Sequence, residues 1–345
     1  MSERTAVILF NLGGPDSLKA VRPFLFNLFN DRAIIRVPQP LRFFLALLIS
    51  TLRAKKARSI YQQMGGKSPI LDQTVAQANA LEKILATKGQ YKVFSCMRYW
   101  HPMSDIVALK VKSYMPDRII LLPLYPQYST TTTASSVAHW DKEANKAGLA
   151  NVPTKLICCY HDDYGFAAAH LQLLKDVYWK AAETGKPRVL FSAHGLPEKI
   201  IKAGDPYQKQ VEESVARIVQ ILSVDGFEYR ICYQSKVGPM KWIGPSTEEE
   251  IIQAGKDGVP LVVVPVAFVS EHSETLVELD VEYRHLANEH GVPGYWRVPA
   301  LGVEPYFIQT LADLCLGKIS NKKQCEYCKK YFPLDSEGTP CKLAA

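Results

Sequence analysis

The sequence predicts an α/β fold made of two domains, each a parallel sheet flanked by helices. At 345 residues the chain is too long for one small hydrophobic core, so two domains are expected. Its composition, 47% hydrophobic and 22% charged residues, is that of an ordinary globular protein. Strand-like and helix-like segments alternate along most of the chain, which indicates βαβ units and parallel sheets covered on both faces.

The expected strands are short apolar runs that end in polar or glycine-containing loops. They cover residues 5–12, 91–97, 117–125, 154–160, 187–194, 229–234, 260–268 and 296–301. Helical periods lie between them, the clearest at 71–86 and 167–183. No low-complexity linker separates the halves of the chain, so we expect the two domains to be closely joined.

Two pairs of segments repeat a common plan. VILFNLGGP (7–15) and RVLFSAHGLP (188–197) each place small residues, a glycine and a proline after an apolar strand. LLPLYPQYS (121–129) and VVPVAFVSE (263–271) each carry a proline inside a strand that ends in a polar loop. We infer two similar halves that face each other across a cleft; the alternative is chance similarity between parallel strands.

Composition and charge exclude several classes of protein. The N-terminus runs directly into VILFNL, so we expect no secretory signal, and the apolar run at 43–49 is far shorter than the roughly 20 residues of a spanning helix. The net charge of +7 suggests an anionic partner, but no nucleic-acid-binding motif is present and basic residues cluster only at 53–58. Eight cysteines without a secretory signal indicate thiols or a metal site rather than a disulfide framework.

Two glycine-rich segments do not predict a nucleotide site. NLGGPD lacks the third glycine of the dinucleotide fingerprint, and Pro15 removes an amide that a phosphate would need. MGGKSP ends like a P-loop, but Tyr61 occupies the position of the first required glycine and Pro69 follows the serine.

An acidic row follows the buried strand at 260–268. Glu274, Glu278 and Glu282 are four residues apart in SEHSETLVELDVEY (270–283), so in a helix they share one face, with His272 just before them. A solvated face is the ordinary explanation of such a row. The carboxyl end of a buried strand, however, is where α/β proteins place ligands.

A second histidine, His194, stands at the end of another apolar strand, where Gly195 and Pro197 turn the chain. An imidazole there can titrate near its usual pKa of ~6.5 or bind a metal, although a lone histidine at a strand end is usually structural. Aromatic and cationic side chains also collect at strand ends, which suits a flat, partly apolar, anionic ligand; packing is the alternative. The aromatic residues are Trp100, Tyr125, Tyr128 and Trp242.

A series of long motifs, in chain order, resembles the ferrochelatase family from about residue 5 to residue 317. They are NLGGPD, LFNDR, GGKSPI, CMRYWHP, LPLYPQYS, SAHGLP, GDPY, CYQSKVGPMKWIGPST and PVAFVSEHSETLVELDVEY. The resemblance implies two Rossmann-like domains of the chelatase type, without a nucleotide, that hold a porphyrin in a cleft between them. It also implies the terminal step of haem synthesis, insertion of Fe²⁺ into protoporphyrin IX with release of two protons.

The domain limits that we expect from the combined pattern are 1–128 plus 297–320 for the first domain and 129–296 for the second. A cysteine-containing extension, 321–345, follows.

The resemblance implies roles for the histidines and the acidic row. His194 and Glu274 would contact the iron from opposite sides of the cleft, with His194 as proton acceptor and His272 beside Glu274. An imidazole nitrogen and a carboxylate oxygen bind Fe²⁺ well enough to hold it and weakly enough to release it. Glu278 and Glu282 would continue the row as a path for protons or metal; for Glu282 the alternative is a surface position.

The segment 37–63 has an apolar first half followed by basic residues, the pattern of an interfacial helix. The resemblance implies a porphyrin lip over 37–68, with Arg53 or Lys56 pairing with a propionate; an ordinary buried helix is the alternative. The other positions that would contact the porphyrin are Leu12, Tyr61, Ser68, Arg98 and Tyr99. We expect a cytoplasmic protein whose segment 37–58 makes peripheral contact with the inner face of the membrane.

Three alternatives to protoporphyrin ferrochelatase remain: insertion into coproporphyrin, insertion of another divalent metal such as cobalt, or a non-catalytic porphyrin or haem carrier of the same fold. A carrier has no need of the acidic row. No nucleic-acid partner is expected, and the sequence leaves the oligomeric state open.

Cysteines near the C-terminus have the spacing of a metal or iron–sulfur site: Cys315, Cys325, Cys328 and Cys341. Some ferrochelatases hold a [2Fe–2S] cluster with three C-terminal cysteines and one internal cysteine, but Thr130 occupies the internal position of the animal pattern. The fourth ligand would be Cys315 or one of the remaining cysteines, which are Cys96, Cys158, Cys159 and Cys232. Free thiols and structural zinc are the alternatives.

Overall fold

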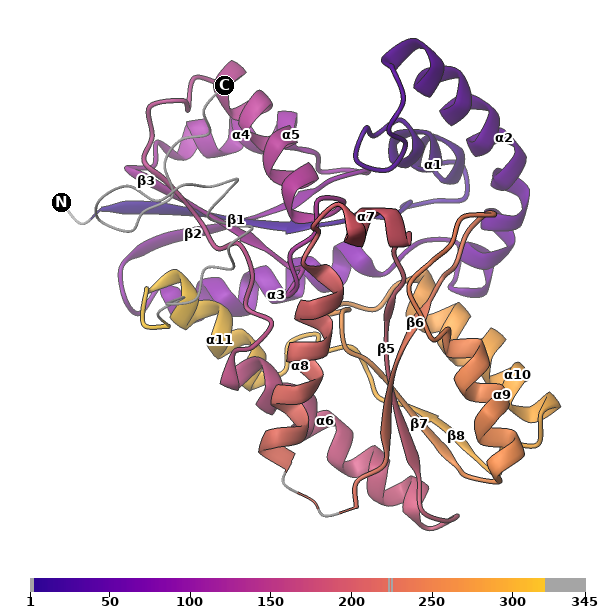
Figure 1. Ribbon diagram of the computed structural model, residues 1–345. Coiled ribbons are helices and arrows are strands. Elements are labelled where there is room, and N and C mark those ends of the chain that lie inside the picture. Colours follow the sequence, from indigo (N-terminus) through magenta and orange to yellow (C-terminus); the bar gives the residue numbers. More distant parts are fainter. Residues whose placement is uncertain (1–2, 223, 225, 320–345) are drawn as a thin grey trace. The chain divides into compact units, whose positions relative to one another are not determined.

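The computed structural model describes residues 3–222, 224 and 226–319, and the chain forms two compact units (Figure 1). One unit contains the chain up to Cys159 and again from Leu311; the other runs from Tyr160 to Thr310.

The first unit is built on a four-stranded parallel sheet of order β2-β1-β3-β4. Its strands are β1 (Arg4–Asn11), β2 (Gln90–Met97), β3 (Arg118–Pro123) and β4 (Thr154–Leu156). Its helices are α1 (Val21–Phe29), α2 (Gln39–Gln63), α3 (Ile70–Leu85), α4 (Ser104–Tyr114) and α5 (Thr133–Lys146). The last helix of the chain, α11 (Pro305–Cys315), begins in the second unit and ends in the first.

The second unit repeats this plan with a parallel sheet of order β6-β5-β7-β8. Its strands are β5 (Arg188–His194), β6 (Tyr229–Gln234), β7 (Leu261–Pro265) and β8 (Tyr295–Arg297). Its helices are α6 (Tyr164–Ala182), α7 (Glu198–Lys202), α8 (Tyr207–Leu222), α9 (Thr247–Asp257), the π-helix η1 (Glu274–Glu282) and α10 (Tyr283–Glu289).

Helices cover both faces of the second sheet, which explains why its central strands β5 and β7 are buried at every position except His194, the last residue of β5. Val189 and Phe191 of β5 point into a core shared with α6 and α8, whereas Leu190 points into a core shared with α9, η1 and α10. Figure 1 shows the same arrangement, with α6 and α8 on one side of β5 and α9 and α10 on the other.

The expected α/β class with two parallel sheets is confirmed. The internal repeat also has a structural counterpart, because its two segment pairs contain β1 and β5, and β3 and β7, which occupy equivalent places in the two strand orders.

Three details differ from the expectation. The first unit extends past residue 128 because β4 pairs with β3, and the second extends past residue 296 because β8 pairs with β7. The strand expected at 154–160 ends at Leu156. The helix that carries the acidic row is a π-helix over Glu274–Glu282 rather than an α-helix.

Candidate active site

The carboxyl edge of the second sheet brings His194 and the acidic row together. His194 is the last residue of β5, and η1 begins nine residues after β7. The His194 ring is held by its own loop, because its Nδ1 atom lies 2.6 Å from the Gly195 carbonyl oxygen. A carbonyl can only accept, so Nδ1 carries the proton and Nε2 keeps a free lone pair in the neutral ring. The side chain is 35% exposed, which leaves that lone pair accessible.

Glu274 lies between the two histidines. Its Oε2 atom is 3.8 Å from Nε2 of His194 and 3.9 Å from Nε2 of His272. The three side chains therefore converge within one unit, rather than approaching from opposite sides of a cleft as we expected for His194 and Glu274. An imidazole nitrogen and a carboxylate oxygen at this separation can share a divalent cation or exchange a proton.

His272 is the buried member of this group. Burial lowers its pKa, and the nearby carboxylates of Glu274 and Glu271 oppose that effect without cancelling it. The ring packs against Phe268 with centroids 4.6 Å apart. The neutral imidazole is the favoured form, so this ring can also act as a proton acceptor.

Glu278, one turn further along η1, accepts hydrogen bonds from four donors. The backbone N–H of Ser235 (2.9 Å) and the Tyr283 hydroxyl (3.0 Å) donate to Oε1. The Ser235 hydroxyl (2.6 Å) and the Gln234 amide (3.2 Å) donate to Oε2. The Ser235 hydroxyl also lies 3.3 Å from Glu274 Oε2, so it links the two carboxylates.

Burial raises the pKa of Glu278, and the neighbouring charge of Glu274 raises it further; the hydrogen bond from Ser235 opposes both. A carboxyl group in this position takes up a proton more readily than an exposed one. That property suits a group that passes protons to or from Glu274.

Glu282 is exposed at the far end of η1, so the structure brings only the first two members of the row together. Three partners of the row were not identified from the sequence: Gln234, Ser235 and Tyr283. Ser235 has a φ of +65°, a strained backbone conformation that is enriched at functional sites. For Gln234 and Ser235 the sequence offered a signal, because CYQSK lies at the end of a predicted strand.

The first unit gathers three of the expected porphyrin contacts. Leu12 follows β1 and packs with the buried Tyr61 and Tyr99 in one apolar cluster near the carboxyl ends of β1 and β2. Ser68 is buried beside Gly14, where a Cβ on the glycine would lie only 2.6 Å from the serine side chain. Arg53 and Lys56 are exposed on α2.

Arg98 is held by Asp31, a residue of the LFNDR motif. Nη2 of Arg98 donates to Asp31 Oδ2 at 2.7 Å, and the Tyr99 hydroxyl donates to the same oxygen at 2.7 Å. Burial raises the pKa of Asp31, but the Arg98 charge and hydrogen bonds from Ser135 and Tyr99 outweigh it and hold the pKa below its usual value. Arg98 therefore has a compensating charge inside its own unit.

Of the possible cluster ligands, Cys325, Cys328 and Cys341 lie outside the described residues. Cys315 is buried at the end of α11, and burial raises the pKa of its thiol to about 12.

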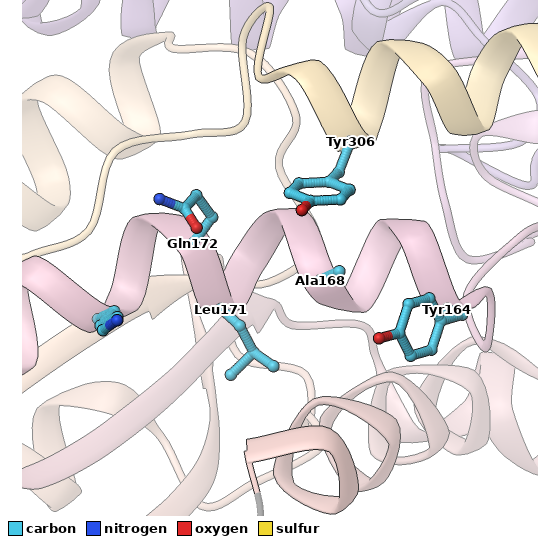
Figure 2. Close-up of a pocket in the computed structure, with 6 residues that line it drawn as sticks. Tyr164, Ala168, Leu171, Gln172 and Tyr306 are labelled. Carbon is cyan, nitrogen blue, oxygen red and sulfur yellow. The ribbon is translucent and has the colours of Figure 1, made fainter.

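A separate hollow of about 210 Å³ lies along α6 and is also lined by Tyr306 of α11 (Figure 2). The Tyr306 side chain points from α11 toward α6, between Gln172 and Tyr164. No histidine, cysteine or acidic residue lines this hollow, so it is not the candidate site.

Comparison with known proteins decides the family. The ferrochelatase family model matches residues 4–319. A ferrochelatase of Wolbachia sp. subsp. Drosophila simulans is 57% identical over 316 residues, which cover 91% of this chain and 99% of the relative. A ferrochelatase of Phenylobacterium zucineum is 51% identical over 319 residues, covering 92% of each. The chain belongs to the ferrochelatase family.

This ferrochelatase is therefore a metal-inserting chelatase of haem biosynthesis, with ferrous iron as its substrate metal. Solved structures confirm the fold at much lower identity. SirB from Bacillus subtilis with Fe³⁺ superposes with a TM-score of 0.54 at 14% identity, covering 93% of this chain and 97% of that one. SirB from Bacillus subtilis subspecies spizizenii in complex with cobalt gives 0.51 at 12% identity, with the same coverage.

Proposed function

We propose that this ferrochelatase inserts Fe²⁺ into protoporphyrin IX at His194 and Glu274. The observation that carries the proposal is the Nδ1 hydrogen bond to the Gly195 carbonyl, which in the neutral ring leaves a lone pair on Nε2 of His194, 3.8 Å from Glu274 Oε2. Free-base porphyrin must lose two pyrrole protons as the dication enters. We expect Nε2 to accept one of these protons and Glu274 to hold the incoming metal.

Glu278 and His272 serve the same site as groups that exchange protons with Glu274. Support comes from the Ser235 hydroxyl that links the two carboxylates and from the 3.9 Å approach of His272. Glu282 would be the solvent end of the path, since it is exposed on the same helix. Leu12, Tyr61, Ser68, Arg98 and Tyr99 are proposed to contact the macrocycle, and Arg53 or Lys56 a propionate.

The substrate assignment is tested with purified protein under anaerobic conditions. Protoporphyrin IX and coproporphyrin are each supplied with Fe²⁺ or Co²⁺, and product is followed by its visible absorption. We expect the highest kcat/KM for Fe²⁺ with protoporphyrin IX. Faster turnover of coproporphyrin, or a preference for Co²⁺, would replace the assignment; porphyrin binding without turnover would indicate a carrier.

We also propose peripheral membrane contact through α2. Its first half exposes apolar side chains to solvent: Leu41, Phe44, Leu48 and Leu52 are each more than half exposed. Arg53, Lys55, Lys56 and Arg58 follow on the same helix and suit anionic headgroups. Among the described residues, none of the helices is long and apolar enough to span a bilayer.

A [2Fe–2S] cluster is proposed with Cys325, Cys328 and Cys341 as three ligands. Such a cluster would supply a redox-active group apart from the insertion chemistry. The fourth ligand would be Cys315, which is buried at the end of α11, or another of the remaining cysteines. Stoichiometric iron and sulfide in aerobically purified protein would support a cluster; colourless protein without them would exclude it.

A further inference from the structure

The side of η1 that faces away from Glu274 and Glu278 is tied to β8. Asp280 lies two residues after Glu278, about half a helical turn around the axis. The Arg297 guanidinium donates to both of its carboxylate oxygens, from Nε to Oδ1 at 2.8 Å and from Nη2 to Oδ2 at 2.7 Å. This is the paired geometry in which arginine binds carboxylates most specifically.

Arg297 also binds the segment that leads into η1. Its Nη1 atom donates to both oxygens of Glu271, at 2.9 and 3.1 Å. The Arg297 side chain is only 9% exposed, and those of Glu271 and Asp280 are 13% and 28% exposed. One buried guanidinium therefore fixes the π-helix at two points, one before its first residue and one in its second half.

Two further contacts join β8 to η1 and to α10, the helix that follows η1 directly. The Tyr295 hydroxyl donates to the Leu279 carbonyl at 2.8 Å, and Arg284 donates from Nη1 to the Tyr295 carbonyl at 2.7 Å. π-helical turns are rare and occur mostly at functional sites. Contacts from β8 would help to maintain this one. Because Arg297 binds both Glu271 and Asp280, it opposes rotation of η1 about its axis and translation of η1 along it.

We propose that Arg297 is a positioning residue for metal insertion, one that holds η1 so that Glu274 stays within reach of Nε2 of His194. The inference rests on the proposed site and extends it to a residue that touches neither metal nor porphyrin. Small displacements of a positioned group can change rates strongly, by about 10²-fold for 1 Å. Loss of the Arg297–Asp280 pair should therefore raise the KM for Fe²⁺ more than the KM for porphyrin.

The same unit contains a matched control. Arg188, at the first position of β5, also binds two carboxylates, with Nε 2.6 Å from Glu228 and Nη2 2.8 Å from Asp257. Its side chain is 7% exposed, close to the value for Arg297. It lies at the amino end of the strand whose carboxyl end carries His194, so its loss should affect stability without moving the acidic row.

The experiment compares Arg297→Met, Asp280→Asn, Arg297→Lys and Arg188→Met with the parent protein. For each, KM for Fe²⁺, KM for porphyrin, kcat and Tm are measured, together with Co²⁺ affinity from visible absorption titration. Arg297→Met and Asp280→Asn should raise KM for Fe²⁺ and the Kd for Co²⁺ about tenfold, with porphyrin KM changed less than about twofold. Arg297→Lys keeps the charge and should recover part of the loss, and Arg188→Met should lower Tm alone.

Asp280→Asn preserves shape and gives the answer if Arg297→Met fails to fold. Unchanged KM for Fe²⁺ and unchanged Co²⁺ affinity in a folded Asp280→Asn variant would overturn the proposal, as would an equal loss in Arg188→Met. Failure of the underlying site assignment has a different signature: His194→Ala and Glu274→Gln would then leave turnover intact.

Discussion

At the scale of single residues, the position of His194 at a strand end could be predicted from the sequence, but its tautomer could not. An apolar run followed by glycine and proline indicates a strand end, and that part was predictable from local pattern alone. The tautomer depends on where the Gly195 carbonyl points after the turn, which no residue spacing encodes. Likewise, the contact between Ser235 and Glu278 joins residues 43 positions apart and needed the structure.

Glu278 should make stability depend on pH in a definite direction. Its pKa is raised in the folded protein by burial and by Glu274, so the folded state binds its proton more tightly than the unfolded state does. The stability that this group contributes is complete below its unfolded pKa, near 4.5, and is lost as the pH rises through the folded value. Glu278→Gln removes the titration, so Tm of the variant minus Tm of the parent should increase between pH 4 and pH 8. A difference that decreases over this range would contradict the assigned direction.

Asp31 should be important for the stability of the first unit. Its carboxylate compensates Arg98, and the two side chains are only 8% and 15% exposed. Removing one partner of a buried ion pair leaves an uncompensated charge, so Asp31→Asn should destabilise the protein by about 3 kcal/mol in denaturant unfolding. Asp16→Asn is the control, because Asp16 is exposed and its one described hydrogen bond comes from the Ser17 hydroxyl. This change should lower the free energy of unfolding by less than about 0.5 kcal/mol. Equal effects of the two changes would count against the role of Asp31.

At the scale of elements, the sequence pattern predicted which face of η1 carries the acidic row but not the π-helical conformation of η1. A spacing of four placed Glu274 and Glu278 on one face, and the structure agrees. The same spacing did not reveal a π-helix, because that conformation depends on contacts such as Arg297–Asp280, made by a strand 17 residues further along the chain. The apolar first half of α2 is exposed, which is the surface that the predicted interfacial helix needs; the membrane contact itself stays a prediction.

The α2 surface gives a direct test of membrane contact. Phe43 packs against Phe26, whereas Phe44 and Leu48 are 65% and 55% exposed, so these two are the better probes. The parent protein should float with anionic liposomes, and Phe44→Ser/Leu48→Ser should reduce the bound fraction severalfold. Leu109→Ser, which removes a 60% exposed leucine on α4, should leave binding unchanged. Failure of the parent to float, or equal binding by the double variant, would rule out this contact surface.

At the scale of the whole molecule, one topology occurs twice, but among the described residues only the second copy pairs histidines with carboxylates at the carboxyl edge of its sheet. The repeat was predictable because β1 and β5 share a local sequence plan. The limits of the units were less predictable, because they depend on edge strands such as β4 and β8, each only three residues long. Such short strands carry little periodic signal of their own.

The central claim is that iron insertion takes place at Nε2 of His194 beside Glu274. The most direct measurement is anaerobic turnover of Fe²⁺ and protoporphyrin IX by His194→Ala, with porphyrin binding followed in parallel by fluorescence quenching. Loss of the proton acceptor should lower kcat about 10²–10⁴-fold, while porphyrin binding stays close to that of the parent. Turnover within about twofold of the parent rate would contradict the account.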